Sequence, residues 1–224
     1  MATDFVYDLN AKPLSSLVPP STAISLARSL VADLDGTWTK CKLHQKAPGI
    51  AVQTYSRKLY GEKWFARKSV HDVPWEWFMS GICEDHTKNE VEYIHEFQSY
   101  EEIDGGESGW TGIVSHYKMG GLLSDRETPV WLFSQQPDLN VREFFVISTP
   151  AEYECTPGRV RALFSAIEHV QELPDGKIQW VMALVSDGGG LIPKWVQDIA
   201  LPKIITNDVP SFLSWAKNKY AAES

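Results

Sequence analysis

The sequence predicts an α+β domain in which one long C-terminal helix lies across a curved antiparallel sheet. Two observations lead to this prediction. The middle of the chain consists of short segments rich in β-branched and aromatic residues, which turn residues separate and hairpins join. After the last of these segments, near residue 185, apolar residues recur at helical spacing as far as Tyr220. A helix that follows many strands needs a sheet to cover, and a curved sheet beneath a helix encloses a space.

The N-terminal part is expected to form an arm and one helix. Residues 1–20 contain a proline pair and are predicted to form the arm, whereas residues 21–224 form a single domain. A helix is predicted over 23–34, because its apolar residues lie on one side at helical spacing. Gly36 suits the end of this helix.

Nine strands and one short helix follow. The short helix is predicted over 74–82, because a proline suits the first turn of a helix. A glycine-rich loop at 104–109 and the tight turn Pro174-Asp175-Gly176 indicate hairpins, and hairpins make neighbouring strands antiparallel. The predicted strands span residues 38–44, 50–58, 64–70, 90–103, 110–117, 129–135, 142–149, 160–173 and 177–185.

Composition and charge narrow the function. Aromatic side chains make up 12% of the chain and include nine tryptophans, which is more ring surface than a core of this size needs. Tryptophan is common in pocket walls, so the composition favours a binding cavity over a merely aromatic core. The net charge of −8 argues against nucleic acid, which requires a basic surface. It also gives no support to constitutive binding of anionic membranes.

The cysteines and the hydropathy pattern predict the compartment. Cys41, Cys83 and Cys155 are an odd number without the spacing of a disulfide framework. The chain opens without a charged-then-apolar signal segment, and no apolar run approaches the ~20 residues that span a bilayer. We therefore expect a reducing compartment, most simply the cytoplasm.

Three motifs resemble those of a known family. Residues 187–195 read Asp-Gly-Gly-Gly-Leu-Ile-Pro-Lys-Trp and resemble the start of the C-terminal helix in START (StAR-related lipid transfer) domains. Residues 208–213 resemble the closing turn of that helix. Residues 122–127 resemble the family's Pro-Leu-Ser-x-Arg-Asp segment, with Gly121 in place of the proline. The stretch 66–94 is most similar to fungal START-like domains of unassigned function.

This resemblance implies a helix-grip fold, in which about nine strands wrap around the C-terminal helix and leave a deep apolar cavity. It further implies binding, and intracellular transfer, of one hydrophobic molecule such as a phospholipid, sterol or acyl lipid. That small molecule is the implied partner, together with transient membrane contact, and we expect a monomer without a cofactor. Pro202 should kink or split the C-terminal helix, because it lacks a backbone N–H, and a kinked helix could act as a lid.

The ligand-binding residues expected on the cavity wall combine apolar side chains with a few polar ones. Arg159 or Arg161 could face inward and either pair with Glu143 or hold a polar head group through paired hydrogen bonds, although a surface position is the simpler explanation for each. For Arg126, a salt bridge at a strand entry is the simpler explanation. The strand phase decides the assignment, since a one-residue slip turns every side chain to the other face. The expected set is Trp110, His116, Arg126, Phe145, Arg161, Trp180, Leu191, Trp195 and Ile199.

Two other function classes remain open. One is a cavity enzyme, namely a cofactor-free cyclase or isomerase acting on a hydrophobic intermediate, with His116, His95 or Tyr117 moving protons. The other is an adaptor whose cavity is filled by its own side chains. A strand histidine is more often structural than catalytic, so binding without catalysis is preferred.

Two short motifs contain zinc-ligand types, namely Cys41-x-x-His44 and Cys83-x-x-His86. Structural zinc sites usually present such pairs on tight turns. The first pair lies in a predicted strand, where its two side chains point to opposite faces. No metal site is therefore expected.

Overall fold

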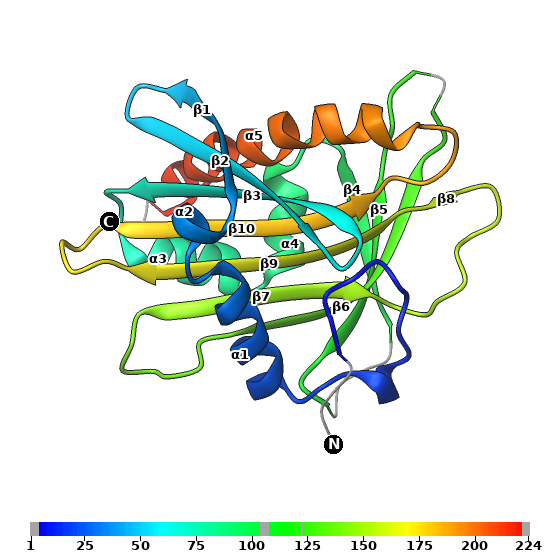
Figure 1. Ribbon diagram of the computed structural model, residues 1–224, viewed down its shortest axis with the longest axis horizontal. Coiled ribbons are helices and arrows are strands. Elements are labelled where there is room, and N and C mark those ends of the chain that lie inside the picture. The colour runs from blue at the N-terminus through cyan, green and yellow to red at the C-terminus, as the bar shows by residue number, and fades with distance from the viewer. Residues whose placement is uncertain (1–4, 104–107, 122, 221–224) are drawn as a thin grey trace.

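A curved sheet of ten strands forms the centre of the computed structural model, which describes residues 5–103, 108–121 and 123–220 (Figure 1). This confirms the predicted α+β class, and the strand expected over 160–173 is divided into two. The strands are β1 (Thr39–Ala47), β2 (Ile50–Leu59), β3 (Glu62–His71), β4 (Phe97–Ile103), β5 (Thr111–Tyr117), β6 (Arg126–Gln135), β7 (Glu143–Pro150), β8 (Val160–Arg161), β9 (Leu163–Glu172) and β10 (Ile178–Asp187).

The strand order across the sheet is β1-β2-β3-β10-β9-β7-β6-β5-β4, and the short β8 lies beside β6. Every neighbouring pair is antiparallel except β8 with β6. The predicted turn at Gly176 joins β9 to β10, and its φ of 81° suits glycine, which has no Cβ to clash. The last strand thus lies inside the sheet, between β3 and β9.

Helices cover both faces of the sheet. Helix α1 (Pro20–Val31) crosses one face over β7 and β9, with the 3-10 turn η1 (Leu14–Ser16) before it and the short α2 (Leu34–Thr37) after it (Figure 1). The other face carries α3 (Trp75–Phe78), the π-helical turn η2 (Met79–Cys83), α4 (His86–Tyr93) and α5 (Lys194–Tyr220).

Apolar residues of the central strands alternate between two cores, which we name the α1-side core and the α5-side core. In β7, Phe145 and Ile147 belong to the α1-side core, whereas Phe144 and Val146 belong to the α5-side core. All eight residues of β7 are buried. A strand covered on both faces reads as an unbroken apolar run, which is what the sequence shows here.

The N-terminal segment packs into the α1-side core. Phe5 and Tyr7 are buried there, and the Tyr7 hydroxyl donates a 2.6 Å hydrogen bond to the carbonyl of Ala23. Lys12 donates its backbone N–H to the carbonyl of Pro150, at the end of β7. The described part of the expected arm is therefore tied to both α1 and the sheet.

One predicted strand is wrong in part. The strand expected over 90–103 starts only at Phe97, because the residues up to Tyr93 belong to α4. Tertiary packing accounts for the helix, since the Tyr93 ring lies 5.6 Å from the Phe212 ring of α5. The loop predicted at 104–109 falls largely outside the described residues.

Helix α5 runs without a break from Lys194 to Tyr220, so of the predicted kink or split at Pro202 the split is wrong, and the kink stays a prediction. Pro202 and Pro210 both lie inside the helix, and the Thr206 hydroxyl donates to the Pro202 carbonyl at 2.8 Å. Neither α5 nor any other helix in the described ranges is long and apolar enough to cross a membrane.

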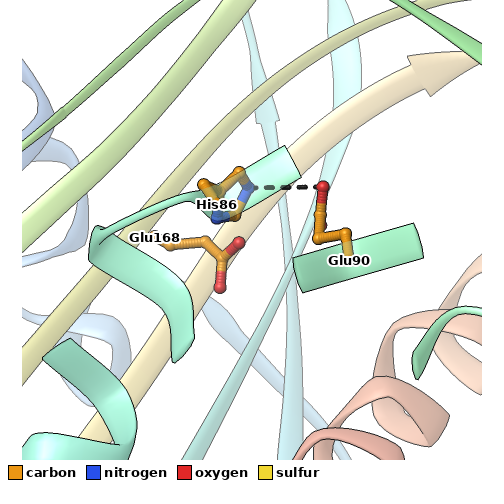
Figure 2. A group of neighbouring side chains, drawn as sticks. All are labelled: His86, Glu90 and Glu168. Carbon is orange, nitrogen blue, oxygen red and sulfur yellow. Dashed lines mark ion pairs between the residues drawn. The ribbon is translucent and has the colours of Figure 1, made fainter. Parts of the chain in front are cut away.

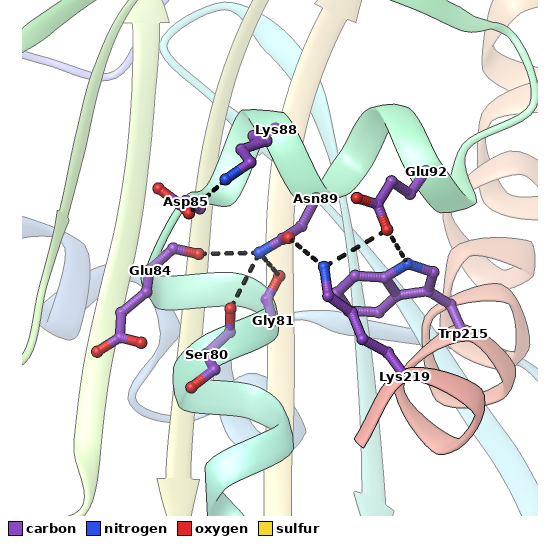
Figure 3. Close-up of polar contacts among 9 residues, drawn as sticks. All are labelled: Ser80, Gly81, Glu84, Asp85, Lys88, Asn89, Glu92, Trp215 and Lys219. Carbon is purple, nitrogen blue, oxygen red and sulfur yellow. Dashed lines mark hydrogen bonds and ion pairs between the residues drawn. The ribbon is translucent and has the colours of Figure 1, made fainter. Parts of the chain in front are cut away.

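A polar cluster attaches α4 to η2 and to the last turns of α5 (Figure 3). From α5, Lys219 donates to the Asn89 side chain at 3.2 Å, and Trp215 donates to the Glu92 carboxylate at 2.8 Å. The Asn89 amide also donates to the carbonyls of Ser80, Gly81 and Glu84, at 2.9, 3.3 and 3.0 Å. These contacts fix α4 in place, and α4 supplies one end of the cavity described next.

Candidate ligand-binding cavity

A cavity of about 770 Å³ lies between the sheet and the N-terminal half of α5. This volume falls within the ~300–1,000 Å³ typical of small-molecule sites. Its strand residues, most of them apolar, are Ile113, Ser115, Tyr117, Thr128, Val130, Leu132, Val146, Ser148, Leu163, Phe164, Ala166, Glu168, Met182, Leu184, Ser186 and Asp187. From α5 and the preceding loop come Gly188, Leu191, Ile192, Pro193, Val196, Gln197, Ala200, Leu201, Ile204, Ile205 and Asp208.

The cavity arises because alternate strand residues face α5 and several of these are small. Ser148 and Ala166 lie directly opposite each other on β7 and β9. Ser115 and Thr128 are paired in the same way on β5 and β6. Small side chains at these positions leave the concave face of the sheet unfilled, and the helix above it closes the space.

The loop between β10 and α5 borders the cavity and is held by polar contacts. Gln197 accepts a hydrogen bond from the Gly188 N–H at 2.7 Å and donates to the Ile192 carbonyl at 2.9 Å. Gly189 has a φ of 64°, and a Cβ there would lie 2.2 Å from the Arg161 carbonyl oxygen. Only glycine fits this position without displacing the backbone.

The two arginines of the expected ligand set bind backbone carbonyls and do not line the cavity. Arg126 is buried and donates to the carbonyls of Gly188, at 2.6 Å, and Ser124. It therefore connects the start of β6 with the loop between β10 and α5, residues 188–193, which we name the glycine loop. Arg161 donates to the carbonyl of Tyr153 at 2.9 Å and so holds the segment after β7.

The cavity lining does not include the expected aromatic residues Trp110, Phe145 and Trp180, and only the first two face the other side of the sheet. Trp110 and Phe145 belong to the α1-side core, where the Phe145 ring stacks on His169 with centroids 4.5 Å apart. Trp180 faces the α5 side but lies behind the cavity wall, where its Nε1–H donates to Glu168 at 2.6 Å. Trp180 thus holds Glu168, which lines the cavity, but does not line the cavity itself.

On the helix side, Leu191 lines the cavity, whereas Trp195 and Ile199 do not. These three side chains are 99%, 67% and 71% exposed, so the last two point outward from α5. Val196 lines the cavity and is also exposed. We refer to Leu191, Trp195, Val196 and Ile199 as the apolar rim.

Of the three residues considered for proton transfer, only Tyr117 lines the cavity. His95 is exposed in the connection between α4 and β4. His116 is buried on the other face of β5, where its Nδ1 lies 2.6 Å from Arg159 and 3.4 Å from Glu127. Its partners are those of a structural histidine.

One end of the cavity is polar and contains residues that the sequence analysis did not select. His86 and Glu90 come from α4 and Glu168 from β9 (Figure 2), and Asp208 comes from α5. The His86 Nε2 lies 3.4 Å from Glu90 Oε2. Ligating atoms of His86, Glu90 and Glu168 all lie within 4.8 Å of one another, so these residues could hold a metal ion.

The carboxyl groups at this end have perturbed acidity. Burial raises the pKa of Glu90 to about 7 and that of Asp208 to about 6, and the Glu168 charge adds to both rises. Arg67 is 1% exposed and acts in the opposite direction on the Asp208 pKa. Its guanidinium lies 3.8 Å from the Trp180 ring centroid and 3.9 Å from Glu168.

Part of this polar end has a signal in the sequence. His86 and Glu90 are four residues apart, which places two side chains on one face of a helix. The strand predicted over 90–103 includes Glu90, so the sequence analysis does not recognise that His86 and Glu90 share one face of a helix. Glu168 and Asp208 have no local signal, because only the folded sheet and α5 bring them close to α4.

Comparisons with known proteins agree with the fold. The model of a family described as "Protein of unknown function (DUF3074)" matches residues 64–216. No curated protein matches the chain. Human StAR-related lipid transfer protein 5 has a TM-score of 0.69 at 15% identity, covering 89% of this chain and 99% of that chain. Human STARD10 has a TM-score of 0.69 at 15% identity, covering 93% of this chain and 86% of that chain.

A bacterial structure gives a similar result. The STAR-related lipid transfer protein fragment from Xanthomonas axonopodis has a TM-score of 0.63 at 13% identity, covering 81% of this chain and 99% of that chain. Likeness at such low identity shows the fold, and it confirms the START-like helix-grip architecture expected from the motifs. The family match spans well over half of the 224 residues. The chain therefore belongs to the DUF3074 family of proteins of unknown function, and it folds as a START-like helix-grip domain.

Proposed function

We propose that this protein binds one hydrophobic small molecule, such as a phospholipid, sterol or acyl lipid, and transfers it between membranes in the cytoplasm. The observation that carries the proposal is the cavity of about 770 Å³ beneath α5, whose walls are mainly apolar. The similar structures are named as lipid transfer proteins, which supports the same ligand class here.

Affinity in such a cavity comes mainly from apolar area removed from water. Each square ångström of buried apolar surface contributes about 25 cal/mol before the cost of association is subtracted. Val130, Leu132 and Leu184 are examples of side chains that supply this surface. The polar end then favours a ligand with one polar group over a plain hydrocarbon.

The apolar rim supports exchange with a membrane. Leu191 and Val196 line the cavity and are exposed, and Trp195 and Ile199 extend the same surface outward. Tryptophan favours the interface of a bilayer, and apolar side chains insert into its boundary. A ligand could then pass between bilayer and cavity along an apolar surface.

Native mass spectrometry of the full chain, followed by extraction, tests the binding step. We expect one lipid-sized molecule per chain. Ala166→Phe places a large ring in the cavity and should abolish retention, whereas Leu139→Phe, at a position 86% exposed, should not. Circular dichroism checks that both variants fold, and Ala200→Trp at the cavity wall serves as a second filled variant. Equal retention by filled and control variants would contradict the proposal.

A transfer assay between donor and acceptor vesicles tests the exchange step. Trp195→Ala combined with Ile199→Ala should slow transfer at least about 5-fold, because membrane binding scales with inserted apolar area, while the cavity keeps its lipid. Leu139→Ala removes an apolar side chain elsewhere that is even more exposed, at 86%, and should transfer at the normal rate. An unchanged rate in the rim variant rules out this route of exchange.

A cyclase or isomerase that uses His116 or His95 is not favoured. His116 faces the α1 side of β5, and His95 is exposed outside the cavity. General acid–base catalysis requires the donor within hydrogen-bond reach of the substrate. Neither histidine meets that condition for a molecule inside the cavity.

A further inference from the structure

Three potential metal ligands meet at the polar end of the cavity (Figure 2). His86 and Glu90 lie one turn apart on α4, and Glu168 reaches the same place from β9. The His86 Nε2 and Glu90 Oε2 atoms are 3.4 Å apart. Two ligands at 2.0–2.2 Å from a tetrahedral zinc ion are about 3.4 Å from each other. This pair already has the spacing of metal ligands.

The hydrogen bond of His86 Nδ1 orients Nε2 toward Glu90. Nδ1 lies 2.9 Å from the carbonyl oxygen of Ile82, and a carbonyl only accepts, so Nδ1 is protonated. Nε2 faces the Glu90 carboxyl group 3.4 Å away, and either a proton or a metal ion between the two atoms would pair them. Histidine ligands of metals are commonly oriented by such a bond from the other ring nitrogen.

Glu168 is held in a comparable way. Its Oε2 accepts a 2.6 Å hydrogen bond from Trp180 and lies 3.9 Å from Arg67. Within the described part of the chain, no residue donates a hydrogen bond to the other oxygen, Oε1. One oxygen is thus anchored by its neighbours, and the other remains available to a ligand at the cavity surface.

The polar end has more acidic than basic side chains. Glu90, Glu168 and Asp208 line it, and the Arg67 guanidinium lies 3.9 Å from Glu168. A divalent cation bound here would replace the protons that otherwise neutralise buried carboxylates.

We propose that His86, Glu90 and Glu168 bind one divalent cation of the zinc type at the polar end of the cavity. Imidazole and carboxylate donors suit zinc, which usually takes four ligands. Three protein ligands leave one position, and it faces the cavity. An oxygen of a bound hydrophobic molecule, such as a carboxylate or hydroxyl, could occupy that position. The metal site extends the proposed function but does not depend on it.

The test is a titration of the full chain with zinc chloride alone, after EDTA treatment and extraction of bound lipid. Calorimetry and elemental analysis should give one zinc per chain. His86→Gln and Glu168→Gln should each weaken binding at least about 10-fold, since each loses one ligand. His95→Gln changes an exposed histidine outside the cavity, and Cys41→Ser removes the exposed thiol near His44. Both controls should bind zinc as the unaltered chain does.

Cobalt(II) substitution identifies the ligand atoms. We expect an absorption spectrum of nitrogen and oxygen ligands only. A thiolate-to-cobalt band would assign the metal to a cysteine and overturn the proposal, as would no stoichiometric binding or unchanged affinity in both ligand variants. Circular dichroism in EDTA checks folding, and Glu90→Gln provides a third variant if the others do not fold. Because no lipid is present, failure here is distinguishable from failure of lipid binding.

Discussion

The two halves of α5 use apolar residues in opposite ways. In the C-terminal half, Val209, Phe212 and Ala216 are completely buried. In the N-terminal half, Trp195 and Ile199 are 67% and 71% exposed. Apolar spacing along one continuous helix therefore does not tell which side chains form a core. The difference depends on what lies beneath the helix, which is a close-packed core under the C-terminal half and the cavity under the N-terminal half.

Aromatic rings fill the space beneath the C-terminal half. The Phe212 ring lies 5.0 Å from Phe78 and 5.3 Å from Trp180. The fit is so close that a Cβ on Gly81 would come within 2.7 Å of the Phe212 ring. Beneath the N-terminal half, Leu201 and Ile205 pack against a smaller cluster of Phe65, Ala166 and Leu184. This half is also held by the polar contacts of Gln197 with the loop between β10 and α5.

Replacing Phe212 tests the buried half and should have the largest effect. Phe212→Ala removes a fully buried ring and leaves a cavity, so we expect a loss of about 3–5 kcal/mol in the free energy of unfolding. Ile199→Ala should change it by less than about 0.5 kcal/mol, because that side chain is mostly exposed. Urea denaturation measures both values. Similar losses in the two variants would remove the distinction between the halves.

Replacing Gly189 tests how the N-terminal half is attached. Gly189→Ala should lower the free energy of unfolding by about 2–3 kcal/mol. The positive φ accounts for about 1–2 kcal/mol of this loss, and the contact of the added Cβ with the Arg161 carbonyl accounts for the rest. Gly176→Ala is the matched control, with a φ of 81° and no atom within 4 Å of the added Cβ. It should cost only about 1–2 kcal/mol in the same denaturation experiment. A larger loss for Gly176→Ala than for Gly189→Ala would show that contact with Arg161 is unimportant.

Asp208 lies where the two halves meet and should make stability depend on pH. Its pKa is raised from 3.8 to about 6, so the folded state binds more protons than the unfolded state between these values. Stability should therefore fall as pH rises from about 4 to 6. Asp208→Asn removes this loss and should gain up to about 3 kcal/mol in the free energy of unfolding at pH 7.5, at about 1.4 kcal/mol per pKa unit, but little at pH 4.

Measurements for this prediction are urea midpoints at both pH values, in EDTA. Asp198→Asn, in the N-terminal half, is the control. It loses only a 3.9 Å ion pair with Lys63 and should change stability by less than about 0.5 kcal/mol at either pH. If Asp208→Asn gains as much at pH 4 as at pH 7.5, the raised pKa is not the cause.

Hydrogen exchange compares the two halves without any mutation. Amides of residues 195–200 should exchange through local opening, at a free energy several kcal/mol below that of global unfolding. Amides of residues 209–216 should exchange only near the global value, because their side chains are buried. A bound lipid should slow the first group selectively. Equal protection of 195–200 with and without ligand would rule out opening of this half as the route of exchange.

Hairpins and the terminal helix could be predicted because their signals are local. The turn at Gly176 and the helical spacing after residue 190 need no knowledge of the rest of the chain. The strand phase could not be predicted in β7, where Phe144 to Ile147 are apolar without interruption. Because both faces of β7 are covered, this segment contains no polar residue to show which side faces the cavity. The sequence therefore predicts the cavity face for Phe145, whereas the structure has it in the α1-side core.

Contacts between residues distant in sequence account for the other differences between the predicted and the observed structure. Residues 90–93 resemble a strand in isolation but form the end of α4, because Glu92 and Tyr93 contact α5. The polar end of the cavity joins α4, β9 and α5, so its composition follows only from the complete fold. Trp195 and Ile199 were expected to face inward, whereas the helix rotation leaves them in solvent.

The position of β10 has a consequence for how the chain folds. The β1–β3 meander and the strands from β4 to β9 share no pairing except through β10, which pairs with both β3 and β9. One edge of β3 pairs with the neighbouring β2, but the other edge stays unpaired until β10, more than a hundred residues later in the chain, has been added. Such distant pairing lowers the folding rate, because a large loop must close before the contact forms. A nascent chain that lacks β10 would carry two separate sheets with unpaired edges, and adding β10 joins them into one sheet.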